Sequence, residues 1–218
     1  MSSVPSVEDD EGALSTRDKL LDAAARLYAE RGIDNVSIAE IVRAAGQRNA
    51  SAVHYHFGNR DEVLRELLAR HVPAIAERRL ELIEKAKARP HDVRAAAEAI
   101  VRPVTEFAQR GWRERAYLQI GWEVGANVER ATPHIRDLMT QTAGYMAWDL
   151  LRERCGSLPA DLWEERQSLC ILFVMTASAN RARLLDRGGD HPVLSDDRFV
   201  DNLIDMVIGA MTAASSLA

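Results

Sequence analysis

The chain has 218 residues, 47% of them hydrophobic, which allows one large domain or a small and a larger domain with a substantial core. Its formal net charge of −5 excludes a protein that coats nucleic acid through overall positive charge, and leaves open DNA binding through a local surface. Its two cysteines, Cys155 and Cys170, do not form a CxxC motif, so we expect reduced structural thiols, with a disulfide or a redox sensor as the alternative. No metal site and no cofactor are expected.

The first segment, residues 1–14, is predicted to be a disordered acidic arm. It contains Glu8, Asp9, Asp10 and Glu11 and lacks the charged and apolar regions of a signal peptide. The longest nearly apolar run, residues 169–179, is too short to span a membrane and is expected to be a buried helix core. These features predict a cytoplasmic protein without a membrane partner.

Two helices are predicted in the next part of the chain. The first follows Ser15 and Thr16, ends at Gly32 and carries a wide apolar stripe. Ser37 and Glu40 then form a capping-box pattern, in which each side chain binds a backbone N–H of the other residue. Gly46 follows the last periodic residue of this second helix, where a positive φ is favoured.

A third, shorter helix is predicted to present a polar outer face. Val53 and Phe57, four residues apart, would anchor its buried side. The residues left to project outward are Arg48, Asn49, Ser51, His54 and Tyr55. Residues 41–60 contain no Asp or Glu, as suits a surface that approaches phosphates. This pair of helices predicts a helix-turn-helix, and the alternative is a polar hairpin outside a helical bundle.

Residues 17–64 resemble the N-terminal DNA-binding domain of the tetracycline-repressor (TetR) family. The resemblance rests on the order and spacing of five fragments: Arg31-Gly32, Val36-Ser37-Ile38-Ala39, Ala45-Gly46, His54-Tyr55-His56-Phe57 and Gly58-Asn59-Arg60-Asp61-Glu62-Val63-Leu64. Two features depart from the family pattern. The segment from Gly46 to Phe57 is one residue longer than usual, and His54 stands where the family has its first tyrosine.

The resemblance implies roles for single residues. His54 and Tyr55 fall where family members touch the DNA backbone and bases, His56 and Arg60 where they contact phosphate, and Ser37 at a cap that also meets a phosphate. From their chemistry, Arg48 suits guanine and Asn49 suits adenine, although both could simply be turn residues. A metal bound by His54 and His56 is not expected, because residues two apart on a helix do not face each other.

Helices are predicted for most of the remaining chain. Their ranges are 61–72, 75–88, 93–110, 112–128, 131–155, 160–187 and 196–214, with Pro73 and Pro103 expected to break or kink the helices that contain them. In the TetR family the helix after the DNA-binding domain leads into the regulatory domain. A bend near Pro73 is therefore a candidate lever between the two.

Aromatic and polar side chains alternate in residues 112–148, as in small-molecule pockets. The candidate ligand-binding residues are Trp112, Tyr117, Gln119, Trp122, Glu123, Asn127, His134, Gln141, Tyr145 and Trp148. The alternative is an ordinary aromatic core. The TetR resemblance implies a ligand pocket among these middle helices.

The last predicted helix is apolar on nearly all sides, so a second surface must cover it. In the TetR family the last two helices pair with their copies in a second subunit. The candidate dimer-interface residues are Leu169, Leu172, Phe173, Thr176, Ala179, Asn180, Phe199, Leu203, Met206, Val207 and Ala210. The alternative is a single bundle with a buried C-terminal helix.

Together these observations predict an all-α protein with a three-helix helix-turn-helix head (15–62) and a larger helical ligand-binding and dimerisation domain (63–218). The expected function is a homodimeric transcriptional regulator, in the manner of a repressor, that binds a palindromic double-stranded operator. A small apolar or amphipathic effector would release it. The alternatives are a helical small-molecule carrier without DNA binding and an α-helical enzyme. No catalytic motif supports the enzyme.

Overall fold

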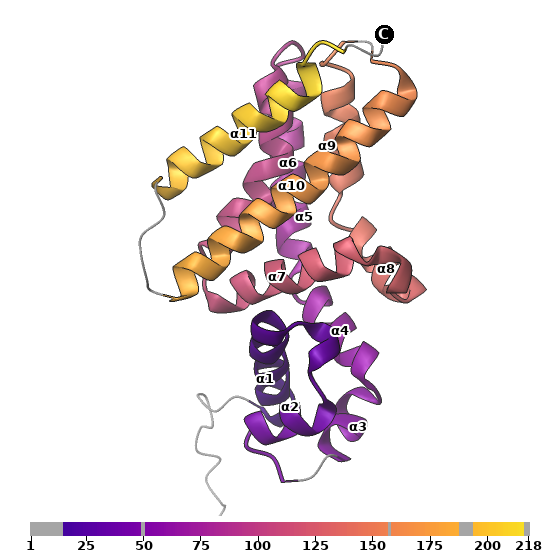
Figure 1. Ribbon diagram of the computed structural model, residues 1–218, viewed down its shortest axis with the longest axis vertical. Helices are drawn as coiled ribbons and strands as arrows, with labels where there is room; N and C mark the ends of the chain where they lie inside the picture. Colours follow the sequence, from indigo (N-terminus) through magenta and orange to yellow (C-terminus); the bar gives the residue numbers. More distant parts are fainter. Residues whose placement is uncertain (1–14, 49–50, 157, 188–193, 216–218) are drawn as a thin grey trace, which may run out of the picture.

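Helices form the regular structure of this protein in a computed structural model that describes residues 15–48, 51–156, 158–187 and 194–215; these residues contain no strand. Figure 1 shows an elongated molecule with a small head at one end and a larger helical body at the other. The predicted all-α class with an N-terminal head is confirmed. The acidic arm predicted for residues 1–14 lies outside the described residues.

The head is built from short capped helices. Their bounds are α1 (Thr16–Arg31), the 3₁₀ turn η1 (Ile33–Asn35), α2 (Ile38–Ala44), α3 (Ser51–Phe57) and α4 (Arg60–Ala69). The Ser15 hydroxyl accepts from the backbone N–H of Asp18, and both halves of the Ser37–Glu40 capping box are present. The predicted starts of α1 and α2 are therefore confirmed.

The body consists of the helices that follow α4, and α7 crosses the molecule next to the head (Figure 1). Their bounds are α5 (Val72–Lys87), α6 (Val93–Ala108), α7 (Trp112–Ala126), η2 (Val128–Arg130), α8 (Pro133–Thr140), α9 (Gly144–Arg152), α10 (Ala160–Arg187) and α11 (Asp196–Thr212). The helical conformation is interrupted between α4 and α5, at Arg70 and His71. Pro73 thus lies in the first turn of α5, where its missing N–H leaves no hydrogen bond unmade.

The single helix predicted for residues 131–155 is wrong. The structure has two helices there, α8 and α9, joined by a turn in which Ala143 adopts a left-handed φ of 56°. Arg79 of α5 donates a hydrogen bond to the carbonyl of Thr142 in this turn. A contact across more than sixty residues of sequence therefore supports a break that carries no strong local signal.

Two apolar cores fill the molecule. One runs from the head into α6, α7 and α8 without interruption, and includes Leu21, Phe57 and Ile120. The other lies farther from the head and is made by α5, α6, α9, α10 and α11. The continuous first core joins the head to the body and packs α1 against α7.

Candidate nucleic-acid interface and ligand cavity

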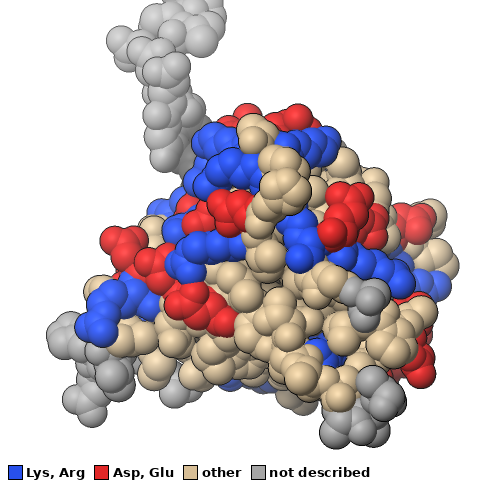
Figure 2. Space-filling model, turned by 90° about the horizontal axis from the view of Figure 1, so that it is seen from above, with Lys and Arg blue, Asp and Glu red and all other residues tan. Residues whose placement is uncertain are grey.

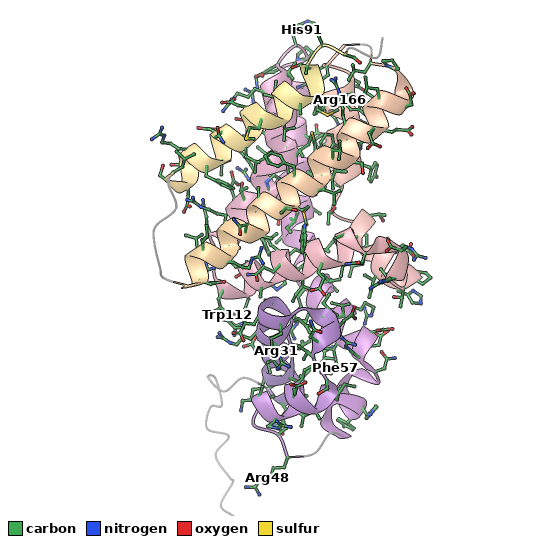
Figure 3. The ribbon with its side chains drawn as sticks, in the orientation of Figure 1. Arg31, Arg48, Phe57, His91, Trp112 and Arg166 are labelled. Carbon is green, nitrogen blue, oxygen red and sulfur yellow. The ribbon has the colours of Figure 1, made fainter. Side chains whose placement is uncertain are left out.

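The outer face of α2 and α3 is the candidate nucleic-acid interface. Val53 and Phe57 are buried, which turns the other side of α3 outward, and Gly46 closes α2 with a φ of 71°. Figure 3 shows Arg48 at the extremity of the head, pointing away from the molecule. The predicted orientation of the short helix pair is thus the one that the structure has.

Tyr55 and His54 are the most accessible aromatic side chains of α3. Tyr55 is 85% exposed. The His54 ring Nδ1 lies 2.7 Å from the carbonyl oxygen of Gly58, and since a carbonyl only accepts, Nδ1 carries the proton. The Nε2 atom is left to contact a partner. His56 is half-buried, with its ring centroid 5.0 Å from that of Tyr55.

Two acidic side chains of the head form ion pairs with arginines. Asp18 pairs with Arg70 at 2.6 Å, and Glu40 pairs with Arg31 at 2.8 Å. Hydrogen bonds from Ser37 and the Arg31 guanidinium lower the pKa of Glu40 to about 2, so its carboxylate stays ionised and hydrogen-bonded to these two residues. An anion approaching the outer face therefore meets basic and neutral groups.

Three other predicted DNA contacts are Ser37, Asn49 and Ser51. The Ser37 side chain is exposed, and its hydroxyl donates to Glu40 at 2.7 Å as part of the cap. Asn49 and the side chain of Ser51 lie outside the described residues.

Arg60 lies elsewhere than the resemblance implies. Its Nη2 donates to the backbone carbonyl of Ile33, and its guanidinium is 3.8 Å from Asp34 and over the ring of Tyr28. The side chain therefore faces the junction between head and body, not the outer face of α3. In this conformation Arg60 is therefore not positioned to contact a phosphate of DNA bound to the outer face of α3.

The junction is closed by a carboxylate of the body. Both carboxylate oxygens of Glu123, on α7, accept from the backbone N–H of Ile33 in the head, at 2.9 and 3.0 Å. Partial burial raises the pKa of Glu123, and the hydrogen bond from Ile33 opposes that shift without cancelling it. Beside it, a cavity of about 150 Å³ is lined by both head and body residues, among them Asn127.

Two further contacts fix α1 against α7. Arg113 forms a bidentate ion pair with Asp22, and the Arg26 guanidinium lies 3.6 Å from the ring centroid of Trp112. Figure 3 places Trp112 at the level where the head meets the body. Together with the hydrogen bond between Glu123 and Ile33, these contacts attach the head to α7.

A large apolar cavity lies in the body on the other side of α7. Its volume is about 530 Å³, within the range of small-molecule sites. It is lined by side chains of α5 to α10, namely Arg79, Ile100, Val104, Gly121, Gly125, Arg136, Met139, Thr140, Thr142, Gly144, Tyr145, Trp148, Gln167, Ile171, Val174 and Met175. Gly121 and Gly125 lie one turn apart, so α7 presents almost bare backbone to the cavity.

Of the ten predicted ligand-binding residues, Tyr145 and Trp148 line this cavity. Glu123 and Asn127 lie at the junction cavity, and Tyr117 lies in the aromatic cluster with His71 and Phe107. Trp112 and Gln119 lie beside α1. The remaining three, Trp122, His134 and Gln141, do not line the 530 Å³ cavity. Trp122 instead donates to the Thr176 hydroxyl at 2.7 Å. The ligand-binding set stays a prediction, and the cavity supports Tyr145 and Trp148 as its members together with the other lining residues as candidates.

Arg79 lines the cavity and was not among the predicted ligand-binding residues, although its position in α5 carries a signal in the sequence. It interrupts the stripe of Ile75, Leu82 and Ile83 on α5, where every other member is apolar and buried. A charged residue at a core position of an amphipathic helix marks either a buried ion pair or a site. The glycines of α7 carried no such signal.

An exposed apolar face runs along α10 and α11. Leu169 is 56% exposed, and Leu172, Phe173, Thr176 and Asn180 follow it at helical spacing on the same face. Met206 and Ala210 on α11 are also exposed. The other predicted interface residues face inward: Ala179, Leu203 and Val207 are buried within the subunit and Phe199 is half-buried.

Figure 2 shows charged side chains of both signs at the end opposite the head, and a broad uncharged area along the side of α10 and α11. Residues 160–186 of α10 are long and apolar enough to cross a membrane by length and composition alone. This differs from the expectation that the apolar run was too short, because the helix extends well beyond residues 169–179.

Comparisons with known proteins give the following matches. Residues 20–67 match a family described as bacterial regulatory proteins, tetR family. The chain is 37% identical over 93 residues to the HTH-type transcriptional regulator BetI of Brucella abortus, covering 43% of this chain and 46% of that protein. It is 33% identical over 97 residues to the HTH-type transcriptional repressor KstR2 of Rhodococcus jostii, covering 44% and 45%. The chain thus matches about half the length of these relatives.

The fold of the whole chain is shared with solved structures. The crystal structure of AibR in complex with isovaleryl coenzyme A and operator DNA aligns with a TM-score of 0.58 and 17% sequence identity. The alignment covers 88% of this chain and 97% of that chain. The body that the two curated relatives leave unmatched therefore has a known architecture.

Proposed function

We propose that this chain, whose residues 20–67 match the tetR family of bacterial regulatory proteins, is a ligand-responsive transcriptional regulator that acts as a repressor in the cytoplasm. The observation that carries the proposal is the position of α7. It forms one wall of the apolar cavity with Gly121 and Gly125, and it holds the head through Glu123. One rigid element therefore touches both the ligand cavity and the DNA-binding domain.

In this proposal the head reads DNA through α3. Tyr55 and His54 approach the backbone and bases, Arg48 reaches a base edge, and His56 and Ser37 contact phosphate. Asn49 and Ser51 remain candidates at the start of the same surface. Two heads in a dimer would contact successive major grooves, so the operator is expected to be a palindrome with half-sites about one helical turn apart.

The exposed face of α10 and α11 is proposed to pair with the same face of a second subunit. Leu169, Leu172 and Phe173 give it apolar side chains, and Ala210 and Gly209 allow close approach. A charge-free helix face of this extent otherwise remains in contact with water, which disfavours a monomer. In this proposal the apolar helix α10 is an interface helix and not a membrane span.

A ligand in the 530 Å³ cavity is proposed to displace α7 and so to change the distance between the two heads. It acts only if it binds the displaced conformation more tightly than the DNA-bound one. AibR was crystallised with both isovaleryl coenzyme A and operator DNA, which supports a two-ligand mechanism in this fold.

The test is a fluorescence-anisotropy titration of the full chain with DNA from upstream of its own coding region, at several salt concentrations. We expect salt-dependent binding that weakens about tenfold or more in Arg48→Ala and Tyr55→Ala, with normal thermal stability. The matched control is Lys85→Ala, which removes a charge from the last turn of α5. Loss of affinity in the control equal to that in Arg48→Ala, or no binding at low salt, would contradict the proposed DNA surface.

A further inference from the structure

The charge of the large cavity points to the class of its ligand. Two of its lining residues are arginines, Arg79 and Arg136, and none of the described lining residues is Asp or Glu. The rest of the lining is mainly apolar, with Trp148, Ile100 and Val174 among its larger side chains. A cavity of this composition suits a molecule with one negative group and an apolar body.

Arg79 is buried without a counter-ion. It is 6% exposed, its Nε donates to the carbonyl of Ala99 at 3.2 Å, and its Nη1 donates to the carbonyl of Thr142. No carboxylate among the described residues lies within ion-pair distance of it. Burial lowers the pKa of Arg79 to about 10, so it still carries its charge at neutral pH.

Two other arginines of the body have carboxylate partners. The preceding residue, Arg78, pairs with Glu106 at 2.7 Å and Glu81 at 2.9 Å, and Arg102 pairs with Asp201 at 3.0 Å. Both are more exposed than Arg79, and so need a partner less. Among the described residues no carboxylate neutralises Arg79, and an anion bound in the cavity would supply the missing counter-ion.

The two carbonyl contacts leave donors for such an anion. A guanidinium has five N–H groups, and the hydrogen bonds to Ala99 and Thr142 use two of them. The carbonyls also fix the plane of the guanidinium, so the remaining donors are preorganised as a fork that suits a carboxylate. Arg136 is exposed and lines the same cavity, which places a second cation at its open side.

Resting on the proposed function, we propose that the effector is an amphipathic anion whose carboxylate-type head binds Arg79 and whose apolar body fills the cavity against Trp148. Arg136 attracts the anion at the opening. The simpler role for Arg79, a strap that holds the turn between α8 and α9, predicts no preference for charge in the ligand.

The experiment uses the full chain and isothermal titration calorimetry. The probes are straight-chain carboxylates from hexanoate to dodecanoate and the primary alcohol of each length. We expect the tightest carboxylate to bind about tenfold to a hundredfold more tightly than its alcohol, the range given by a hydrogen-bonded charge. In Arg79→Met the carboxylate should fall to the affinity of the alcohol, and the alcohol should bind as before.

Arg136→Gln provides a second variant on an exposed site, in case Arg79→Met does not fold. It should weaken the carboxylate by about threefold, as expected for a partly screened charge, and leave the alcohol unchanged. Equal binding of carboxylates and alcohols by the wild type, or equal loss of both in Arg79→Met, would overturn the inference.

Operator binding, measured on the same preparations, separates this inference from the function on which it rests. Normal DNA binding with no anion preference refutes the anionic effector alone. Anion-selective binding without any DNA binding refutes the regulator and leaves the anion site standing.

Discussion

Glu123 offers the sharpest test of the junction between body and head. Both of its oxygens accept from the Ile33 N–H, and its pKa is raised because partial burial disfavours the charged form by more than this hydrogen bond restores. Glutamine has the same shape and keeps one acceptor without the charge. Glu123→Gln should therefore unfold at the same denaturant concentration as the wild type, or a higher one, at neutral pH.

Glu123→Ala should behave differently, because it removes the acceptor. An unsatisfied N–H costs about 1–3 kcal/mol when fully buried. Ile33 is half-buried and borders a cavity of about 150 Å³ that can admit water, so we expect a cost near the low end, about 1 kcal/mol. For a chain of this size that corresponds to a fall in Tm of about 2–4 °C.

The effect of pH distinguishes charge from shape. A carboxyl whose pKa is raised by folding is relatively destabilising while it is ionised, and this penalty disappears as it takes up a proton. Wild type should therefore gain stability relative to Glu123→Gln as the pH falls from neutrality toward the ordinary Glu value of 4.5. Urea unfolding of the three proteins at pH 7 and pH 5 measures both quantities.

Two results would refute this reasoning. One is a loss of stability in Glu123→Gln as large as that in Glu123→Ala, which would mean that the charge itself holds the head. The other is a difference between wild type and Glu123→Gln that does not change with pH.

Three further predictions follow from the same structure. Tyr55→Phe should keep most of the operator affinity if the ring stacks on the sugar–phosphate backbone, whereas Tyr55→Ala should lose about tenfold; equal losses in anisotropy titrations would assign the contact to the hydroxyl. Leu172→Asp should weaken the dimer by more than about a hundredfold in analytical ultracentrifugation, since it buries an unpaired charge, and the equally exposed Leu80→Asp on α5 should not. Gly125→Leu should be tolerated by the fold, because a Cβ at this position meets no atom within 4 Å. The leucine side chain should fill the cavity and abolish probe binding while DNA binding persists. Unchanged probe affinity would place the ligand elsewhere.

Local signals predicted the head well. The caps at Ser15 and Ser37 depend on residues three positions away, and the structure forms both of them. Val53 and Phe57 are buried as their spacing indicated, because one short helix has a single side that can face a core.

The failures all involve contacts between distant residues. The turn after Thr140 is supported by Arg79, and Arg60 turns toward Ile33 instead of an outer surface. The cavity was expected among aromatic residues 112–148, but Tyr117 packs in a core and seven of the sixteen lining residues come from α5, α6 and α10. Helical periodicity says which side of a helix is apolar, and not which partner covers it.

The most direct test of the regulator account is a pair of titrations that must agree. Operator affinity is measured with and without a saturating cavity ligand identified from the probe series, and ligand affinity is measured with and without operator. We expect the ligand to weaken operator binding and the operator to weaken ligand binding by the same factor, since the two sites share one coupling free energy. Binding of both partners with no change in either affinity would contradict the claim that α7 connects them.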